Sequence, residues 1–297
     1  MFFYTAYNLG IHSQIPLRGL VEETDVPKDV SIQLREIDRS EKAMPRDASL
    51  FLGETPGVAM FLVRAGQAIV VDPAPGAEEL LLGALVLGPL MAVLLRQRGY
   101  AVLHASSIAT NAGAVVFLGD SGSGKSTLAG AFYESGYGIM TDDVMPVRFE
   151  NGHAYVVPGY PSVKLFPHTA TLLGCETTAM DFVHPQIGKR SHSVAQRFPA
   201  EPLQLCRMYV LAEAEVDSIE PLRPQEIFRE LVRNSRAATL LRDPESLHAH
   251  LRDCTRLAAD ISVFRLRRRR AISSLPQLIQ LIEQHLAQDT QTPKEVR

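Results

Sequence analysis

Short apolar runs alternate with polar turns along much of this chain, and their spacing predicts a mixture of strands and helices. In the first part, residues 58–64 and 67–71 flank Ala65-Gly66 and predict a β-hairpin. The stretch Asp72-Pro73-Ala74-Pro75-Gly76 then ends the strand pattern, because proline and glycine interrupt regular structure. The first 76 residues therefore predict short strands and turns.

One apolar stretch is much longer than the others. Residues 80–95 carry no charged side chain and predict a helix that ends near Gly99. A bilayer-spanning helix needs about 20 apolar residues, and this stretch is shorter and is interrupted by Gly83, Gly88 and Pro89. We therefore predict a buried core helix and no membrane contact.

The rest of the chain alternates strands and helices. Strands are expected at residues 101–104, continuing through 106–109, and at 114–118, 139–140, 207–212 and 262–266. A hairpin is expected at residues 144–157 around Asn151-Gly152, a strong turn signal. Helices are expected at residues 225–234, 243–260 and 275–286. This order predicts an α/β fold, with residues 1–96 as a smaller α+β region and 97–297 as the main domain.

The strongest motif follows the apolar strand at residues 114–118. Its sequence, Gly119-Asp120-Ser121-Gly122-Ser123-Gly124-Lys125-Ser126, fits the phosphate-binding pattern G-x-x-x-x-G-K-[ST] without a mismatch, and a helix-compatible run follows it. In such a loop, backbone N–H groups turn toward a phosphate, and the helix start adds unpaired donors. Lys125 would reach the β- and γ-phosphates, and the Ser126 hydroxyl would bind Mg²⁺. The predicted nucleotide-binding residues are Gly119, Asp120, Ser121, Gly122, Ser123, Gly124, Lys125, Ser126 and Thr127.

Two adjacent carboxylates form the second informative feature. Asp142 and Asp143 follow Lys125 by only 17 and 18 residues and end the next predicted strand. In a parallel sheet that strand end lies at the same edge as the phosphate loop. Asp142 could then share Mg²⁺ with Ser126, and Asp143 could act as the base, although the two roles could be exchanged. Adjacent carboxylates should also raise each other's pKa, which suits a base near neutral pH.

Three further candidates are weaker. His104 ends a strand just upstream and could point into the same cleft. Lys189 and Arg190 lie in residues 181–202, a polar stretch that predicts a mobile loop, where they could neutralise charge on a transferred phosphoryl group. Lys164 follows a predicted bend and has less support.

Composition narrows the function classes further. The net charge of −3 over 297 residues gives no overall footprint for nucleic acid. The basic run that includes Arg265 and residues 267–270 lacks interleaved aromatics and predicts first a solvated turn, with contact to an acidic partner and then to nucleic acid as the alternatives. Cys175, Cys206 and Cys254 are far apart and odd in number, which favours free thiols in a reducing, cytoplasmic compartment.

Three segments together carry a family resemblance. Leu103-His104-Ala105-Ser106-Ser107-Ile108, residues 116–127 and Tyr137-Gly138-Ile139-Met140-Thr141-Asp142-Asp143-Val144 resemble the catalytic domain of HPr kinase/phosphorylase. The likeness is greatest to stand-alone HPr-kinase-like peptide kinases, including those of lasso-peptide clusters. It covers residues 100–170 most specifically and 202–286 more loosely. It implies a phosphate-loop kinase core, an ATP- and Mg²⁺-dependent serine kinase, and His104, Asp142 and Asp143 as active-site residues.

The chain departs from that family at one motif. HPr kinases carry an E-x-R-G-x-G segment after the Asp pair, whereas this chain has Val157-Pro158-Gly159-Tyr160-Pro161, with no glutamate. The difference puts phosphorylase activity, and HPr itself as the substrate, in doubt.

We therefore expect transfer of the γ-phosphoryl group of ATP to a serine of a peptide or small protein. Lys125, Asp142, Asp143 and His104 are the expected catalytic residues. A small-molecule hydroxyl kinase of the same fold and a non-catalytic nucleotide-binding regulatory module stay open as alternatives. Homo-oligomerisation also stays open.

Overall fold

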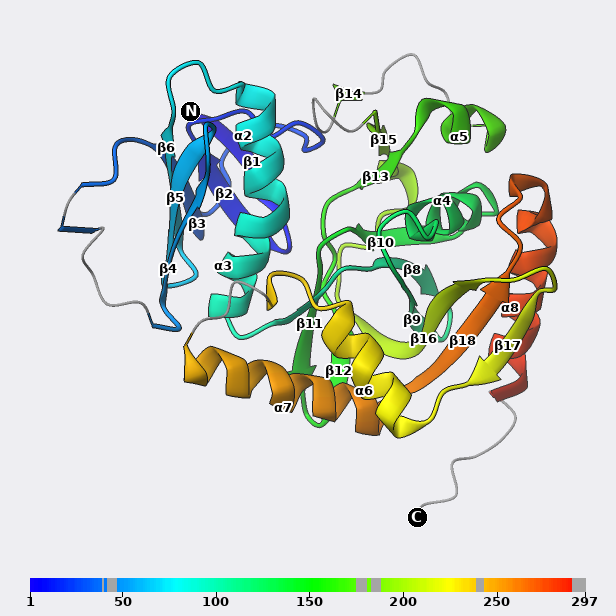
Figure 1. Ribbon diagram of the computed structural model, residues 1–297. Helices are drawn as coiled ribbons and strands as arrows, with labels where there is room; N and C mark the ends of the chain where they lie inside the picture. The colour runs from blue at the N-terminus through cyan, green and yellow to red at the C-terminus, as the bar shows by residue number, and fades with distance from the viewer. Residues whose placement is uncertain (39, 42–46, 175–180, 183–187, 239–242, 290–297) are drawn as a thin grey trace.

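The computed structural model describes residues 1–38, 40–41, 47–174, 181–182, 188–238 and 243–289. Within these residues the chain is mixed α/β, with a six-stranded, a nine-stranded and a three-stranded sheet (Figure 1). The predicted fold class is confirmed at this level. The predicted division at residue 96 stays a prediction.

The N-terminal sheet has the strand order β1-β2-β3-β6-β5-β4. The predicted hairpin within it is confirmed, because β5 and β6 pair antiparallel and both Ala65 and Gly66 have positive φ, at 53° and 63°. The strands are β1 (Phe2–Ala6), β2 (Leu9–Ser13), β3 (Val30–Leu34), β4 (Leu50–Thr55), β5 (Ala59–Arg64) and β6 (Ala68–Pro73).

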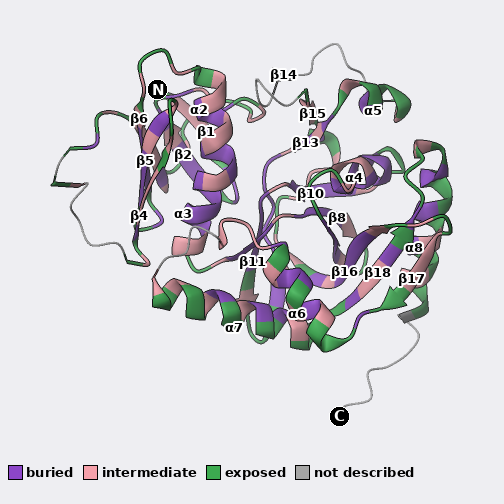
Figure 2. Cartoon of the chain, in the orientation of Figure 1, coloured by how far each residue is buried: buried purple, intermediate pink, exposed green. Residues whose placement is uncertain are grey.

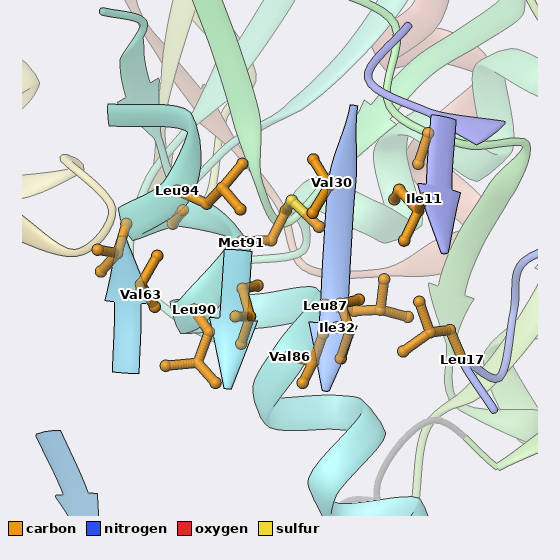
Figure 3. Close-up of a cluster of buried hydrophobic side chains, with 14 of the residues drawn as sticks. Ile11, Leu17, Val30, Ile32, Val63, Val86, Leu87, Leu90, Met91 and Leu94 are labelled. Carbon is orange, nitrogen blue, oxygen red and sulfur yellow. The ribbon is translucent and has the colours of Figure 1, made fainter. Parts of the chain in front are cut away.

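The long apolar stretch forms one helical segment beside this sheet, built from α2 (Glu79–Leu85), a π-helical turn (Val86–Leu90) and α3 (Met91–Gln97). Pro89 lies inside the π turn; proline has no N–H and its ring clashes with the carbonyl four residues earlier, which explains the wider turn. By length and composition, Glu79–Gln97 is the one described segment able to cross a membrane, but most of it is buried inside the structure. Figure 3 shows its side chains packed against strands of the sheet.

The second sheet has β9, β16 and β18 parallel at its centre. β10 runs in the same direction as β9, but β8 lies between them and is antiparallel to both. The expectation of a parallel sheet here was therefore wrong in detail, although β10 still ends at the edge where β9 ends. The strands of this second sheet are β7 (Ala101–Leu103), β8 (Ser106–Thr110), β9 (Gly113–Leu118), β10 (Gly138–Asp142), β11 (Met145–Glu150), β12 (His153–Val156), β16 (Leu203–Glu213), β17 (Ser218–Pro221) and β18 (Ser262–Arg268).

Another expectation was also wrong. Residues 101–109 do not form one continued strand, because β7 pairs with β11 whereas β8 pairs with β9 and β10. The chain changes partner at His104 and Ala105, so His104 lies at a strand end. The predicted hairpin at residues 144–157 is confirmed as β11 and β12.

Helices cover both faces of the second sheet. Along β9, Val115 and Phe117 pack with α4 (Lys125–Glu134) and α8 (Leu275–Asp289), whereas Val116 and Leu118 pack with α6 (Pro224–Arg233) and α7 (Pro244–Asp260). Successive side chains of a strand point to opposite faces, so a strand buried on both faces is apolar throughout. Figure 2 shows the buried strands between helices whose outer faces are exposed.

The third sheet has the order β13-β15-β14. Part of residues 181–202, which predicted a mobile loop, instead forms β15 (Arg190–Ser193), paired with β13 (Ser162–Leu165), and a 3₁₀ turn (Ala195–Arg197). β15 lacks the apolar pattern that predicts a strand, and its backbone pairing with β13 holds it in the strand conformation. β14 (Asp181–Phe182) and α5 (Pro167–Leu172) complete this part, and residues 183–187 lie outside the described residues.

The N-terminal sheet and the main domain share one hydrophobic cluster. Val102, Val144 and Tyr160 belong to the same core as the N-terminal strands and the long helix. The backbone N–H of Tyr7 donates to the Gly159 carbonyl at 2.8 Å. The N-terminal region is therefore packed on the main domain next to the end of β10.

Candidate active site

The glycine-rich loop (residues 119–124) joins β9 to α4, as the motif predicts. Gly119, Gly122 and Gly124 have φ of 143°, 80° and 92°, a region that L side chains rarely adopt. Gly124 is further constrained, because a Cβ there would collide with the Arg268 guanidinium. Backbone conformation and close packing thus explain the glycines of the motif.

The first residues of this loop are held by Arg233 and Asn234 at the C-terminal end of α6. Asn234 Oδ1 accepts from the Gly119 N–H at 3.0 Å, and Arg233 Nη2 donates to Asp120 Oδ2 at 2.6 Å. These contacts occupy the first residues of the loop. Gly119, Asp120 and Ser123 are not among the residues that line the adjoining cavity, whereas the other predicted nucleotide-binding residues line it, namely Ser121, Gly122, Gly124, Lys125, Ser126 and Thr127.

Two arginines hold the front of the loop. Arg268 Nη2 donates to the Ser123 carbonyl, and Arg270 Nη2 donates to the Gly122 carbonyl at 2.6 Å. Arg268 is only 5% exposed and belongs to β18. The prediction of a solvated turn was wrong for Arg268. The strand β18 continues two residues beyond the apolar run, and its alternate side chains point toward the interior.

Lys125 begins α4 and is buried. Its Nζ donates to the carbonyls of Gly119 and Asp120 at 2.6 and 3.0 Å. Burial lowers the pKa of Lys125 to about 8, although Asp142 and Asp143 act in the opposite direction. A polyphosphate beside this ammonium would favour its charged form.

Asp142 ends β10 within hydrogen-bond reach of the α4 start. Its Oδ1 accepts from Ser106 Oγ at 2.6 Å and from Ser126 Oγ at 2.8 Å, and its Oδ2 accepts from the Lys164 N–H at 2.9 Å. The predicted pairing of Ser126 and Asp142 is therefore present. One hydroxyl and one carboxylate fit Mg²⁺, which is usually held by one or two carboxylates together with phosphate and water oxygens.

The Asp143 carboxylate contacts a different set of side chains. Its φ of 81° is in the left-handed region, which is unusual for a residue other than glycine. His104 Nδ1 lies 2.9 Å from Oδ1, Arg236 Nη2 lies 3.2 Å from Oδ1, and Lys164 Nζ lies 3.0 Å from Oδ2. One carboxylate thus faces two permanent cations and an imidazole.

The expectation that the paired carboxylates raise each other's pKa was wrong for Asp143. Burial alone would raise the pKa of this carboxyl, but Lys164, the hydrogen bond from His104 and the charge of Arg236 hold it well below its ordinary value. The same ion pair outweighs burial at Lys164 and raises the pKa of that ammonium. Asp143 is therefore ionised throughout the physiological range.

His104 has both a backbone and a side-chain role here. Its N–H donates to the Asn234 carbonyl at 2.6 Å, and its ring Nδ1 lies 3.2 Å from the Asp143 carbonyl as well as near the carboxylate. The half-buried ring lines the cavity. The structure thus brings the predicted His104 to Asp143.

A cavity of about 700 Å³ joins these groups. Lys189 belongs to its lining, with Nζ 5.7 Å from the centre of the Phe166 ring. Arg190 is in β15 opposite Leu165 and is not among the described lining residues. The other wall consists of residues from the long helical segment, namely Leu80, Gly83, Ala84, Leu85, Leu87, Gly88 and Pro89.

Sequence reasoning missed several residues of this site. Arg236 and Asn234 lie in no motif, and only folding brings the end of α6 to the loop and to Asp143. Arg268 and Arg270 were visible as a basic run, but the run gave no sign of which arginines point inward. Lys164 was a weak candidate, yet it makes the shortest contact of a permanent cation with Asp143 among the described residues.

No protein-family model matches the chain, and no curated protein matches it. Among solved structures, the HPr(Ser) kinase/phosphatase from Coxiella burnetii is similar, with 14% sequence identity and a TM-score of 0.36. That match covers 64% of this chain and 98% of the other.

Proposed function

We propose that this protein is an ATP- and Mg²⁺-dependent kinase that transfers the γ-phosphoryl group to a serine hydroxyl of a peptide or small protein. The observation that carries the proposal is that Lys125, Ser126, Asp142 and Asp143 line one cavity at the start of α4. Phosphoryl transfer needs mainly positioning and charge neutralisation, and this set supplies both.

The glycine-rich loop and the start of α4 would hold the triphosphate through backbone N–H groups. Lys125, Arg268 and Arg270 add positive charge around it. Ser126 and Asp142 would hold Mg²⁺, which would supply positive charge to neutralise the phosphates. Lys189 lies where a loop cation could approach the phosphates.

The acceptor hydroxyl would lie beside Asp143. The serine oxygen forms a bond to the γ-phosphorus as the bond from that phosphorus to the β–γ bridging oxygen breaks, and ADP leaves. The hydroxyl proton passes to the Asp143 carboxylate and then to water. A carboxylate of low pKa can do this, because the hydroxyl becomes strongly acidic as its bond to phosphorus forms. Lys164, Arg236 and His104 hold the carboxylate ionised and in place.

The site bears differently on the two alternative functions, a regulatory nucleotide binder and a small-molecule kinase. A regulatory nucleotide binder has no need for an ionised carboxylate held by His104, Lys164 and Arg236, so the Asp143 cluster favours catalysis. A small-molecule kinase stays a second candidate, because apolar residues of the long helical segment wall the cavity close to Asp143.

The test is transfer of label from γ-labelled ATP, with Mg²⁺, to a library of serine peptides and to a panel of small alcohols. We expect labelled serine, and a fall of about a hundredfold or more in Asp143→Asn and Lys125→Met. Lys28→Met, at an exposed lysine of the N-terminal region, is the matched control. Undiminished transfer by Asp143→Asn would overturn the mechanism, and label found only in small alcohols would select the second candidate.

A further inference from the structure

The long helical segment has two apolar faces with different surroundings. Leu82, Val86 and Leu90 are buried in the N-terminal core. Leu80 and Ala84 lie on another face, are only half-buried and line the active-site cavity. Leu87 continues that row at helical spacing and also lines the cavity, but it is only 5% exposed and belongs to the N-terminal core as well. A helix that is apolar on both faces needs an apolar partner on each, and the cavity face has space before it.

The end of this apolar face near Gly88 lies next to the reacting groups. A Cβ placed on Gly88 would lie 3.6 Å from Arg236 Nη2, which in turn lies 3.2 Å from Asp143 Oδ1. The π turn contains Gly88, and π turns inside helices occur frequently at functional sites. The absence of a side chain at Gly88 keeps open the space between the helix and Arg236.

The cavity therefore has two chemically distinct parts. One part is formed by the glycine-rich loop, Lys125, Arg268 and Arg270, and suits phosphates. The other is formed by the helix face, with Tyr160 from the same hydrophobic cluster. The whole volume, about 700 Å³, lies within the range of roughly 300–1,000 Å³ for small-molecule sites, so only a small part of an acceptor enters beside a nucleotide.

We propose that the helix face formed by Leu80, Ala84 and Leu87 binds an aliphatic or aromatic side chain next to the acceptor serine. The proposal rests on the proposed function, since it assigns the acceptor end of the same cavity. Burying one aliphatic side chain against this face favours an acceptor serine with an apolar neighbour. The N-terminal region is thus part of the acceptor site and selects the substrate.

The experiment compares two heptapeptides, Gly-Gly-Leu-Ser-Leu-Gly-Gly and Gly-Gly-Gly-Ser-Gly-Gly-Gly, as acceptors for labelled ATP. We expect kcat/KM to be about tenfold or more higher for the leucine peptide. Leu80→Asp should bring the ratio of the two values close to one, and a peptide with lysine in place of leucine should then be preferred. Leu81→Asp is the matched control, because Leu81 is a half-buried neighbour on the same helix outside the cavity lining.

The two peptides' binding to the protein with a non-hydrolysable ATP analogue is measured in parallel, by fluorescence anisotropy. Equal kcat/KM for both peptides, or an unchanged ratio in Leu80→Asp, would overturn the inference while leaving the kinase proposal in place. If neither peptide is labelled, these peptides are not substrates, and the binding measurement then tests the apolar subsite separately. Tighter binding of the leucine peptide that is lost in Leu80→Asp supports the subsite. Equal binding of the two peptides refutes it.

Discussion

Replacing Arg268 by methionine tests whether the basic run at the end of β18 is part of the nucleotide site. Arg268 is 5% exposed, donates to the Ser123 carbonyl and occupies the space beside Gly124. Burial and the charge of Arg270 lower the pKa of its guanidinium, but an arginine stays charged. Methionine keeps most of the apolar volume and removes the charge and the hydrogen bond.

The size of the effect follows from the lost interactions. A hydrogen bond to a charged group contributes about 1.5–3 kcal/mol, and the removed charge lies beside the proposed triphosphate site. We therefore expect the Kd of an ATP analogue to rise by about 10- to 100-fold, since each 1.4 kcal/mol is tenfold in affinity.

Arg267→Met is the matched comparison. Arg267 is the preceding residue of the same strand, but its side chain is 44% exposed and pairs with Glu220 at 3.3 Å. An exposed ion pair contributes about 0–1 kcal/mol, and this one lies away from the loop, so its loss should leave nucleotide affinity within about twofold.

The assay is the shift of the thermal unfolding midpoint with increasing ATP analogue and Mg²⁺. A ligand stabilises the folded state by RT ln(1 + [L]/Kd), so the shift measures affinity separately from any change in the stability of the nucleotide-free protein. Equal shifts in wild type and Arg268→Met would refute the role of Arg268. Equal losses of nucleotide affinity in Arg268→Met and Arg267→Met would show that the strand attracts the nucleotide through its net charge and not through Arg268 in particular.

Two further predictions concern the residues around Asp143 and Gly119. Lys164→Met should raise the pKa of Asp143 by about 1–3 units, seen by carbon NMR of labelled aspartates, whereas Lys164→Arg should not. Because this pKa is depressed in the folded state, the ionised Asp143 stabilises the fold above the ordinary Asp pKa of about 4, and this stabilisation is lost as pH falls through the folded-state pKa. The free energies of unfolding of wild type and Lys164→Met should therefore converge in strongly acidic solution. An unchanged Asp143 pKa in Lys164→Met would contradict the assigned cause. Asn234→Ala removes the acceptor of the Gly119 N–H and should cost about 1–3 kcal/mol in urea unfolding, whereas exposed Asn111→Ala should cost little; equal costs would exclude a specific role for that bond.

Local patterns predicted much of this molecule. The hairpins at residues 58–71 and 144–157 follow from two apolar runs around a turn signal, and both are present. The glycine-rich motif predicted its strand–loop–helix setting, because φ and close backbone packing there require glycine. The pairing of Ser126 with Asp142 also followed, since β9 and β10 end at one edge.

Other expectations failed where an interaction depends on distant segments. Residues 181–202 are polar, yet part of them forms a strand, because β13 supplies backbone partners. The adjacent carboxylates predicted mutual repulsion, but folding brings Lys164 and Arg236 to Asp143, and these cations hold the pKa of its carboxyl low.

The local geometry of the loop, the two hairpins and the apolar character of the long helix can be predicted from the amino-acid sequence, because each depends on neighbouring residues and their backbone preferences. The inward position of Arg268, the contacts of Arg236 and Lys164 that hold Asp143 ionised, and the cavity wall formed by one face of the long helix are visible only in the folded molecule. Those outcomes depend on contacts between segments far apart in the chain, and burial and charge pairing at such contacts leave no periodic signal in the sequence.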